Sequence, residues 1–182
     1  MKENQIPCGV CSHSSGQLDG ETCRECGGTG FVAVVEPSAP KVRILNHSEL
    51  SEFVRSLITS GSPIDPVVPM ILGGDRLSCC DEAVAVEVDG VIVGVATIAP
   101  QGEMNSGEPT IVGNYVLRKH RSKGLGTKLM AAAVERCRAR GFSKVRVDVM
   151  STHEMKIIEA LPDDLKSMLD VQDHGAILDM FI

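Results

Sequence analysis

Residues 82–99, "EAVAVEVDGVIVGVATIA", constrain the fold of this chain more than any other stretch. Two runs rich in β-branched residues lie on either side of Asp89 and Gly90, and such runs are typical of strands. An Asp-Gly pair favours the primed two-residue turns that join antiparallel strands. The sequence therefore predicts a β-hairpin here.

Further elements are expected on both sides of this hairpin. "SPIDPVVPMILGGD", residues 62–75, has three prolines and predicts an irregular or short helical segment. The element order predicts a mixed α/β sheet flanked by helices. The other predictions are strands at 31–35, 41–45, 110–117 and 143–150, helices at 46–61, 124–141 and 152–161, and a final strand pair in "LKSMLDV" and "GAILDMFI".

Four cysteines near the N-terminus have the spacing Cys-x2-Cys-x11-Cys-x2-Cys. Each Cys-x-x-Cys can supply two thiolates to a tetrahedral zinc ion, and four thiolates close its coordination shell. The pattern predicts a structural, non-catalytic zinc; free thiols, a disulfide pair and an iron–sulfur cluster are the alternatives. The predicted ligands are Cys8, Cys11, Cys23 and Cys26.

A proline-bearing segment separates these cysteines from the rest of the chain. "EPSAP", residues 36–40, is typical of a stiff linker. We therefore expect a zinc-knuckle module at residues 1–36 and a second domain at 41–182. A module of this size has too little core to fold without its metal.

The charge and composition of the chain exclude some functions. The net charge is −6, and residues 1–40 carry two Lys and Arg against five Asp and Glu, so phosphate attraction cannot bring this module onto nucleic acid. No apolar run approaches the ~20 residues of a membrane span. The N-terminus lacks the apolar core of a signal peptide, so we expect a cytoplasmic protein.

Residues 117–146 are strongly basic, with ten Lys and Arg against one Glu. In "VLRKHRSKGLGTKLM", a strand ends near Leu117, a basic turn follows, and Gly124 and Gly126 open a helix. The first turn of a helix has unpaired N–H groups, and glycines let a ligand approach the backbone closely. The segment predicts an anion site; the alternative is a tight turn with solvated charges.

"RSKGLG", Arg121 to Gly126, resembles the Arg/Gln-x-x-Gly-x-Gly/Ala motif of the GNAT N-acyltransferases. "VDGVIVGVATIA" and "YVLRKHRSKGLGTKLMAAAVERCRARG" resemble that family's second hairpin and its fourth strand, pyrophosphate loop and third helix. The resemblance covers residues 41–182 and implies a mostly antiparallel GNAT-like sheet. "CRECGGTG" separately resembles a repeat of DnaJ-type cysteine-rich domains.

The GNAT resemblance implies acetyl-CoA as cosubstrate and an amine as acceptor. It implies that backbone amides of the loop hold the pyrophosphate, and that Val116 offers backbone hydrogen bonds to the pantetheine arm and the thioester carbonyl. The amine attacks directly, without a covalent enzyme intermediate. The candidate CoA-binding residues are Val116, Arg118, Arg121, Ser122, Lys123, Gly124, Leu125, Gly126 and Thr127.

The catalytic residues are harder to predict. The family's Asn-x-x-Ala-x-x-x-Tyr pattern falls on His153, Lys156 and Ala160, so its tyrosine acid is missing; His153, Ser151 or a water is the candidate replacement. Two-residue alternation places Glu108 in phase with Asn114, which makes Glu108 the candidate base unless a bulge shifts the phase. Tyr115 is a further candidate.

Two other functions fit the same residues. The missing tyrosine also suits a non-catalytic CoA-binding sensor or scaffold, with the zinc knuckle as its protein-interaction surface. A third reading is a protein-directed acetyltransferase whose knuckle recruits the target. We expect a protein partner at the knuckle and a homodimer, and neither nucleic acid nor membrane as a partner.

Overall fold

The computed structural model describes residues 5–10, 17–18, 21–33, 38–59, 80–103 and 106–177. The chain divides into two compact units, Met1–Ser38 and Ala39–Ile182. Cys11, Cys79 and the segment at 62–75 lie outside the described residues, as do residues 178–182 of the predicted final strand.

The first unit contains two pairs of very short antiparallel strands. β1 (Gln5–Pro7) pairs with β4 (Phe31–Ala33), and β2 (Gln17–Leu18) pairs with β3 (Glu21–Thr22). The buried cluster described in this unit consists of three cysteines, with Val32 packed against them. A cluster of this size, as far as the unit is described, is too small to stabilise a fold by itself. The cysteines in this cluster are Cys8, Cys23 and Cys26.

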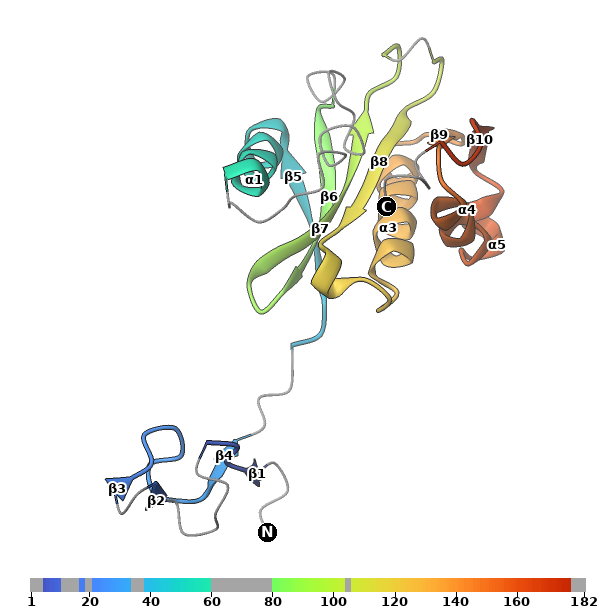
Figure 1. Ribbon diagram of the computed structural model, residues 1–182. Coiled ribbons are helices and arrows are strands. Elements are labelled where there is room, and N and C mark those ends of the chain that lie inside the picture. Colours follow the sequence, from blue (N-terminus) through green and yellow to red (C-terminus); the bar gives the residue numbers. More distant parts are fainter. Residues whose placement is uncertain are drawn as a thin grey trace. The chain divides into compact units, whose positions relative to one another are not determined.

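The second unit is built on a sheet of six strands in the order β10-β9-β8-β7-β6-β5 (Figure 1). The pairings from β5 to β8 are antiparallel, whereas β9 is parallel to both β8 and β10. The predicted mixed, mostly antiparallel sheet is confirmed. The strands are β5 (Lys41–Asn46), β6 (Glu82–Val88), β7 (Val91–Ala99), β8 (Thr110–Val116), β9 (Val145–Val149) and β10 (Leu169–Asp173).

The predicted hairpin is formed by β6 and β7. Asp89 and Gly90 join them with φ angles of 53° and 78°, as a type I′ turn requires. Within β7, Gly94 lies so close to β8 that a Cβ atom would be 2.8 Å from the carbonyl oxygen of Tyr115. Glycine at this position therefore allows the two strands and the helix above them to pack closely.

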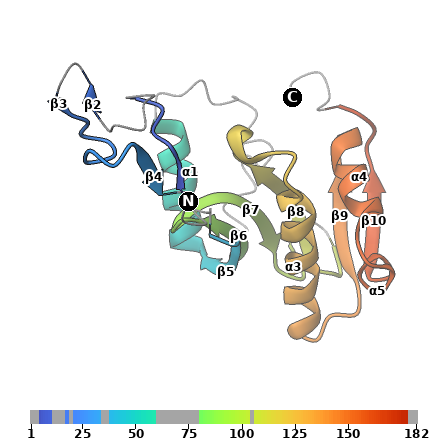
Figure 2. The same cartoon turned by 90° about the horizontal axis from the view of Figure 1, so that it is seen from below.

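Helix α1 (His47–Thr59) covers one face of this sheet (Figure 2). Its start is a reciprocal capping box: Asn46 Oδ1 accepts from the Glu49 N–H, and Glu49 Oε2 accepts from the Asn46 N–H, each at 3.0 Å. The predicted apolar face is buried against the sheet and consists of Leu50, Phe53, Val54 and Leu57.

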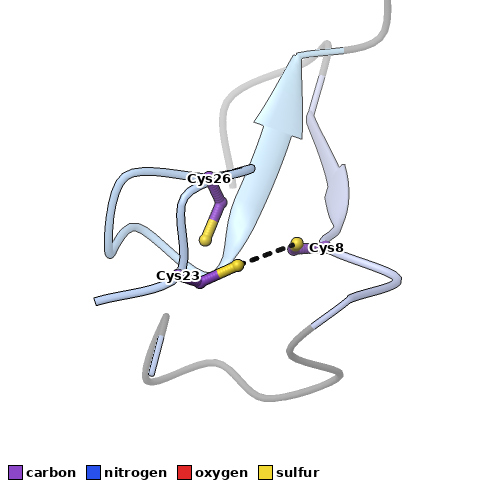
Figure 3. Close-up of side chains that lie close together, drawn as sticks. All are labelled: Cys8, Cys23 and Cys26. Carbon is purple, nitrogen blue, oxygen red and sulfur yellow. Dashed lines mark hydrogen bonds between the residues drawn. The ribbon is translucent and has the colours of Figure 1, made fainter. Parts of the chain in front are cut away.

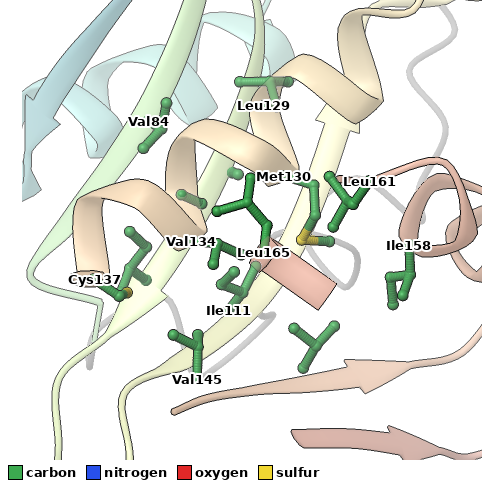
Figure 4. Close-up of a cluster of buried hydrophobic side chains, with 14 of the residues drawn as sticks. Val84, Ile111, Leu129, Met130, Val134, Cys137, Val145, Ile158, Leu161 and Leu165 are labelled. Carbon is green, nitrogen blue, oxygen red and sulfur yellow. The ribbon is translucent and has the colours of Figure 1, made fainter. Parts of the chain in front are cut away.

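The opposite face is covered by α3 (Leu125–Ala139), α4 (Thr152–Glu159) and the short α5 (Asp163–Lys166). Figure 4 shows their shared core, in which Leu129, Met130, Val134 and Cys137 of α3 lie over the sheet. The prediction of a strand across "LKSMLDV" is partly wrong, because α5 takes its first residues and β10 starts only at Leu169. None of the helices in the described part of the chain is long and apolar enough to cross a membrane.

Candidate functional site

A pocket opens where β8 and β9 stop pairing. Their ladder consists of the pairs Thr110 with Arg146 and Ile111 with Val147, at the start of both strands. On the other side of β8, the register with β7 skips Val112, which marks a β-bulge. A bulge bends its strand, and beyond this point the two parallel neighbours leave space between them.

The pocket has a volume of about 270 Å³. One wall is the second half of β8, and the opposite wall is the end of β9 with the first turns of α4. The turn after β8 and the start of α3 complete it. The site is thus a gap in the sheet, closed at one end by the N-terminus of a 15-residue helix.

The backbone at the end of β8 points into this gap. The Leu117 N–H donates to the Val93 carbonyl at 2.8 Å, so the alternation of an antiparallel ladder turns the polar groups of Val116 away from β7. They face the side on which β8 has separated from β9. The Val116 carbonyl accepts a hydrogen bond from Arg121 Nε at 3.0 Å.

The turn between β8 and α3 is built from unusual backbone conformations. A short 3-10 helix, η2 (Arg118–His120), is followed by Ser122 with φ 59° and Gly124 with φ 72°. Gly124 is the N-cap of α3, and the Lys128 N–H donates to its carbonyl. The N–H groups of the first helical turn precede this bond and have no partner within the helix. With the helix dipole, these donors can attract an anion to the pocket wall.

Most of the predicted CoA-binding residues meet at this pocket. Arg118 and Lys123 are not among its lining residues, although they belong to the same basic turn. The predicted residues that line it are Val116, Arg121, Ser122, Gly124, Leu125, Gly126 and Thr127. Their role in CoA binding stays a prediction, but the chain does bring them together.

Gly126 has a packing reason of its own. A Cβ atom built on it would be 2.8 Å from Ile157 Cδ1 on α4. The missing side chain therefore lets α3 and α4 approach each other beside the pocket. Asn114 fixes the other side of this turn, since its Nδ2 donates to the Gly126 carbonyl at 3.0 Å.

The alternation argument for Glu108 is wrong, because the bulge at Val112 shifts the phase of the strand. Val112 packs with the core under α1, whereas Asn114 reaches α3 on the other face. Glu108 lies before the start of β8 and is not among the pocket residues; its N–H donates to Ser106 Oγ at 3.1 Å. Its assignment as the base stays a prediction that the pocket does not support.

The other two catalytic candidates do line the pocket. Tyr115 is buried in the core under α1, and the Arg121 guanidinium lies 5.6 Å from the centre of its ring. His153 is an exposed residue in the first turn of α4. Sequence reasoning missed a third, His120, whose pKa is lowered by partial burial and by the nearby charges of Lys123 and Lys119.

Sequence reasoning also missed two carboxylates on the far wall, Asp148 and Glu154. Burial raises the pKa of Glu154 to about 7; a hydrogen bond from the Met150 backbone opposes this shift, and the charge of Asp148 adds to it. Ser151 Oγ accepts from the Glu154 N–H at 3.1 Å and caps the helix. The Ser-x-x-Glu capping signature was readable, but the pocket beside it was not.

The first unit holds a candidate metal centre (Figure 3). The Sγ atoms of Cys8, Cys23 and Cys26 all lie within 4.8 Å of one another, and Cys8 and Cys23 are 3.9 Å apart. Tetrahedral zinc with bonds of about 2.3 Å places its sulfurs about 3.8 Å apart, so this cluster fits the ion. Three of the predicted ligands therefore meet; Cys11 lies outside the described residues.

The comparisons with known proteins identify the family. The model of the acetyltransferase (GNAT) family matches residues 61–157, which are 97 of the 182 residues. The chain therefore belongs to the GNAT acetyltransferase family and is an acetyl-CoA-dependent N-acetyltransferase. No curated protein matches the chain.

Solved structures share the fold at low sequence identity. The aminoglycoside N-acetyltransferase AAC(6')-Iy in complex with CoA is 21% identical, with 71% of this chain and 92% of that chain covered and a TM-score of 0.50. A ribosomal-protein-alanine N-acetyltransferase from Brucella melitensis biovar Abortus 2308 is 22% identical, over 69% and 92% of the two chains, with a TM-score of 0.48. IAA acetyltransferase from Bacillus cereus ATCC 14579 is 18% identical, over 66% and 74%, also at 0.48.

Proposed function

We propose that acetyl-CoA binds in the pocket between β8 and β9, with its diphosphate on the first turn of α3. The observation that carries this assignment is that two kinds of backbone donor border one cavity. The N–H groups of Leu125, Gly126 and Thr127 suit a dianionic group, and the open edge at Val116 suits an amide-bearing chain. Arg121 and Ser122 complete the turn around the phosphates.

The acetyl group is transferred directly to an amine in a ternary complex. A thioester lying along β8 has the Val116 N–H as a donor to its carbonyl oxygen, where negative charge develops during attack. A pocket that holds the amine nitrogen beside this carbonyl carbon lowers the barrier by proximity and orientation, so no covalent enzyme intermediate is needed.

The acceptor class is an amine of the kinds that the structural neighbours are named for. AAC(6')-Iy is described as an aminoglycoside N-acetyltransferase, and the Brucella protein acts on a ribosomal protein alanine. These names suggest two probes: an aminoglycoside, for which sisomicin can serve, and a peptide with N-terminal alanine. An aliphatic diamine, 1,5-diaminopentane, adds a simple amine to the panel.

We also propose that Cys8, Cys11, Cys23 and Cys26 hold one structural zinc ion in the first unit. The proposal is supported by the spacing in the sequence and by the sulfur cluster. Thiolates of this kind persist in the reducing cytoplasm, where we place the protein. This unit is then a surface for a protein partner rather than part of the reaction.

A charge-matched pair of variants at Ser122 tests the phosphate assignment. Ser122 is exposed and has a positive φ, a conformation that Asn and Asp tolerate better than other non-glycine residues. Asp and Asn differ in charge and hardly in shape. We expect Ser122→Asp to weaken acetyl-CoA binding about tenfold relative to Ser122→Asn, and the difference to shrink at high salt.

Isothermal titration calorimetry measures the affinity, and release of free CoA thiol with the amine panel measures turnover. Equal affinities of the two variants would contradict the phosphate site at this turn. Tight binding of acetyl-CoA without turnover of any amine would instead favour the CoA-binding sensor.

A further inference from the structure

The far wall of the pocket carries a carboxyl group that neither the CoA assignment nor the family motif uses. Glu154 belongs to the first turn of α4 and lines the pocket opposite β8. It is half-buried, and its side chain accepts a hydrogen bond from the Met150 backbone. This bond fixes the carboxyl group at the end of β9 and not on a flexible loop.

Among the residues that the structure describes, few charged and titratable groups lie around Glu154. Asp148 on β9 is the nearest charge that affects it, and Asp148 is itself held by Arg146 and His174. β8 contributes Tyr115, and the described pocket residues at the start of α3 are uncharged. The remaining groups on the wall are His153 on the same helix, and His120 and Arg121 across the pocket.

These groups differ in how well they can accept a proton from an amine. Asp148 Oδ1 is already bonded to Arg146 Nε and Nη2 at 3.1 and 2.9 Å, and the Asp148 side chain is only 5% exposed. Partial burial and the nearby lysines lower the pKa of His120 and so weaken it as a base. Burial raises the pKa of Glu154 and makes its carboxylate a stronger base than usual, and among the described residues no cation offsets this effect.

We propose that Glu154 is the catalytic residue that takes the proton from the acceptor amine, which enters the pocket as an ammonium ion. This role rests on the proposed acetyl transfer. It also assigns the acceptor class: an amine that is cationic at neutral pH, drawn toward the wall formed by Asp148 and Glu154.

The step balances in protons and electrons. The ammonium group gives one proton to the Glu154 carboxylate, and the nitrogen lone pair then attacks the thioester carbonyl carbon. The carbon–sulfur bond breaks, and the sulfur leaves with that bonding pair as the CoA thiolate. A second proton from nitrogen ends on this thiolate, the third stays on the amide, and Glu154 releases its proton to solvent before the next turnover.

The pH dependence of the wild-type enzyme tests this role. The probe is the best acceptor of the panel whose amine, like a lysine side chain, titrates near 10. If Glu154 must be ionised and the amine protonated, kcat/KM rises with pH up to about 7 and is then level until the amine itself titrates. A rate that keeps rising in proportion to the free amine would overturn the proposal.

Variants show which residue causes the inflection near pH 7 in the kcat/KM profile. Glu154→Gln keeps an oxygen for the Met150 N–H and should lose the inflection and about 10²-fold in kcat/KM at pH 7, while acetyl-CoA affinity and melting temperature show that it folds. His120→Gln and His153→Gln should keep the inflection. Asp148→Asn should move it to lower pH, because a negative charge beside Glu154 is removed.

Glu159→Gln is the matched control, since Glu159 is an exposed glutamate on the same helix and outside the pocket. It should have the wild-type profile. An active Glu154→Gln with the wild-type inflection would refute the role of Glu154 and leave acetyl transfer intact. Binding of acetyl-CoA without turnover of any amine by the wild type would refute the proposed function itself.

Discussion

Arg121 turns its side chain back onto the strand that precedes it, and its Nε donates to the Val116 carbonyl at 3.0 Å. The guanidinium also lies 5.6 Å from the centre of the Tyr115 ring. Arg121, the first residue of the "RSKGLG" motif, therefore fixes the turn to the end of β8. The hydrogen bond to Val116 gives a physical reason for a side chain with an N–H donor at position 121.

Replacing Arg121 should separate this positioning role from simple charge. Arg121→Ala removes the hydrogen bond and should weaken acetyl-CoA binding about five- to tenfold, since one such bond contributes on the order of 1 kcal/mol. Arg121→Gln removes the charge, but its amide can still donate to the Val116 carbonyl. We expect it to bind better than Arg121→Ala in calorimetry; identical losses would mean that charge alone matters.

Gly126 should matter chiefly because of its neighbour on α4. Gly126→Ala places a methyl group 2.8 Å from Ile157 Cδ1; because that atom is the end of a flexible side chain that can move, the change should cost no more than about 1 kcal/mol of unfolding free energy. Ile157→Val removes that terminal methyl group. The double variant should therefore recover part of the loss, which urea denaturation of all four proteins measures as a coupling energy. Strict additivity would show that the two residues do not meet.

The sequence predicted the second unit well because local rules agree with the tertiary structure there. The Asp89-Gly90 turn, the apolar face of α1 and the glycine that opens α3 all depend on neighbours within a few residues. The face of the sheet on which each β8 side chain lies could not be predicted. It depends on the bulge at Val112, and this bulge depends on how β8 fits between its antiparallel neighbour β7 and its parallel neighbour β9. Glu108 was assigned on that phase. Glu154 is in α4, and its place at the pocket depends on how that helix packs, which the sequence does not show.

The strongly basic segment at residues 117–146 was also interpreted too simply. Its charge predicted an anionic ligand, yet several of its arginines pair with carboxylates away from the pocket. Arg136 and Arg140 both bind the buried Glu82, at 2.9 and 2.7 Å, and Arg138 has acidic partners as well. Arg146 pairs with Asp148 at the pocket wall. Net charge along a sequence cannot separate such ion pairs from a binding surface, because their partners are distant in the chain.

Removal of the metal should unfold the first unit alone. We expect purified protein to contain about one zinc per chain, and a chelator to expose Cys8, Cys23 and Cys26 to a thiol reagent. Cys137 serves as an internal control: its thiol is in the core under α3, and burial raises its pKa to about 11. It should stay unreactive while acetyl-CoA binding persists.

Elemental analysis and mass spectrometry of the modified peptides measure both effects. Iron in the protein together with visible absorbance would show that the cysteines hold an iron–sulfur cluster and not zinc. Modification of Cys137 at the same rate as the other cysteines would show that the two units unfold together.

The raised pKa of Glu154 should also appear in stability, independently of any substrate. In the folded protein Glu154 keeps its proton up to about pH 7, whereas in the unfolded chain it releases it near the ordinary value of 4.5. Unfolding therefore releases a proton between these values, and the free energy of unfolding falls as pH rises through this window. Gln at this position cannot ionise. Relative to wild type, Glu154→Gln should gain about 1–3 kcal/mol in the free energy of unfolding between pH 4.5 and pH 8.

Urea denaturation across this range, with Glu159→Gln as the control, measures the gain. Because metal and cysteine titrations are common to all three proteins, they cancel in the difference. Parallel curves for wild type and Glu154→Gln would mean that the carboxyl group is solvated like any surface glutamate, and a base role near neutral pH would lose its physical support.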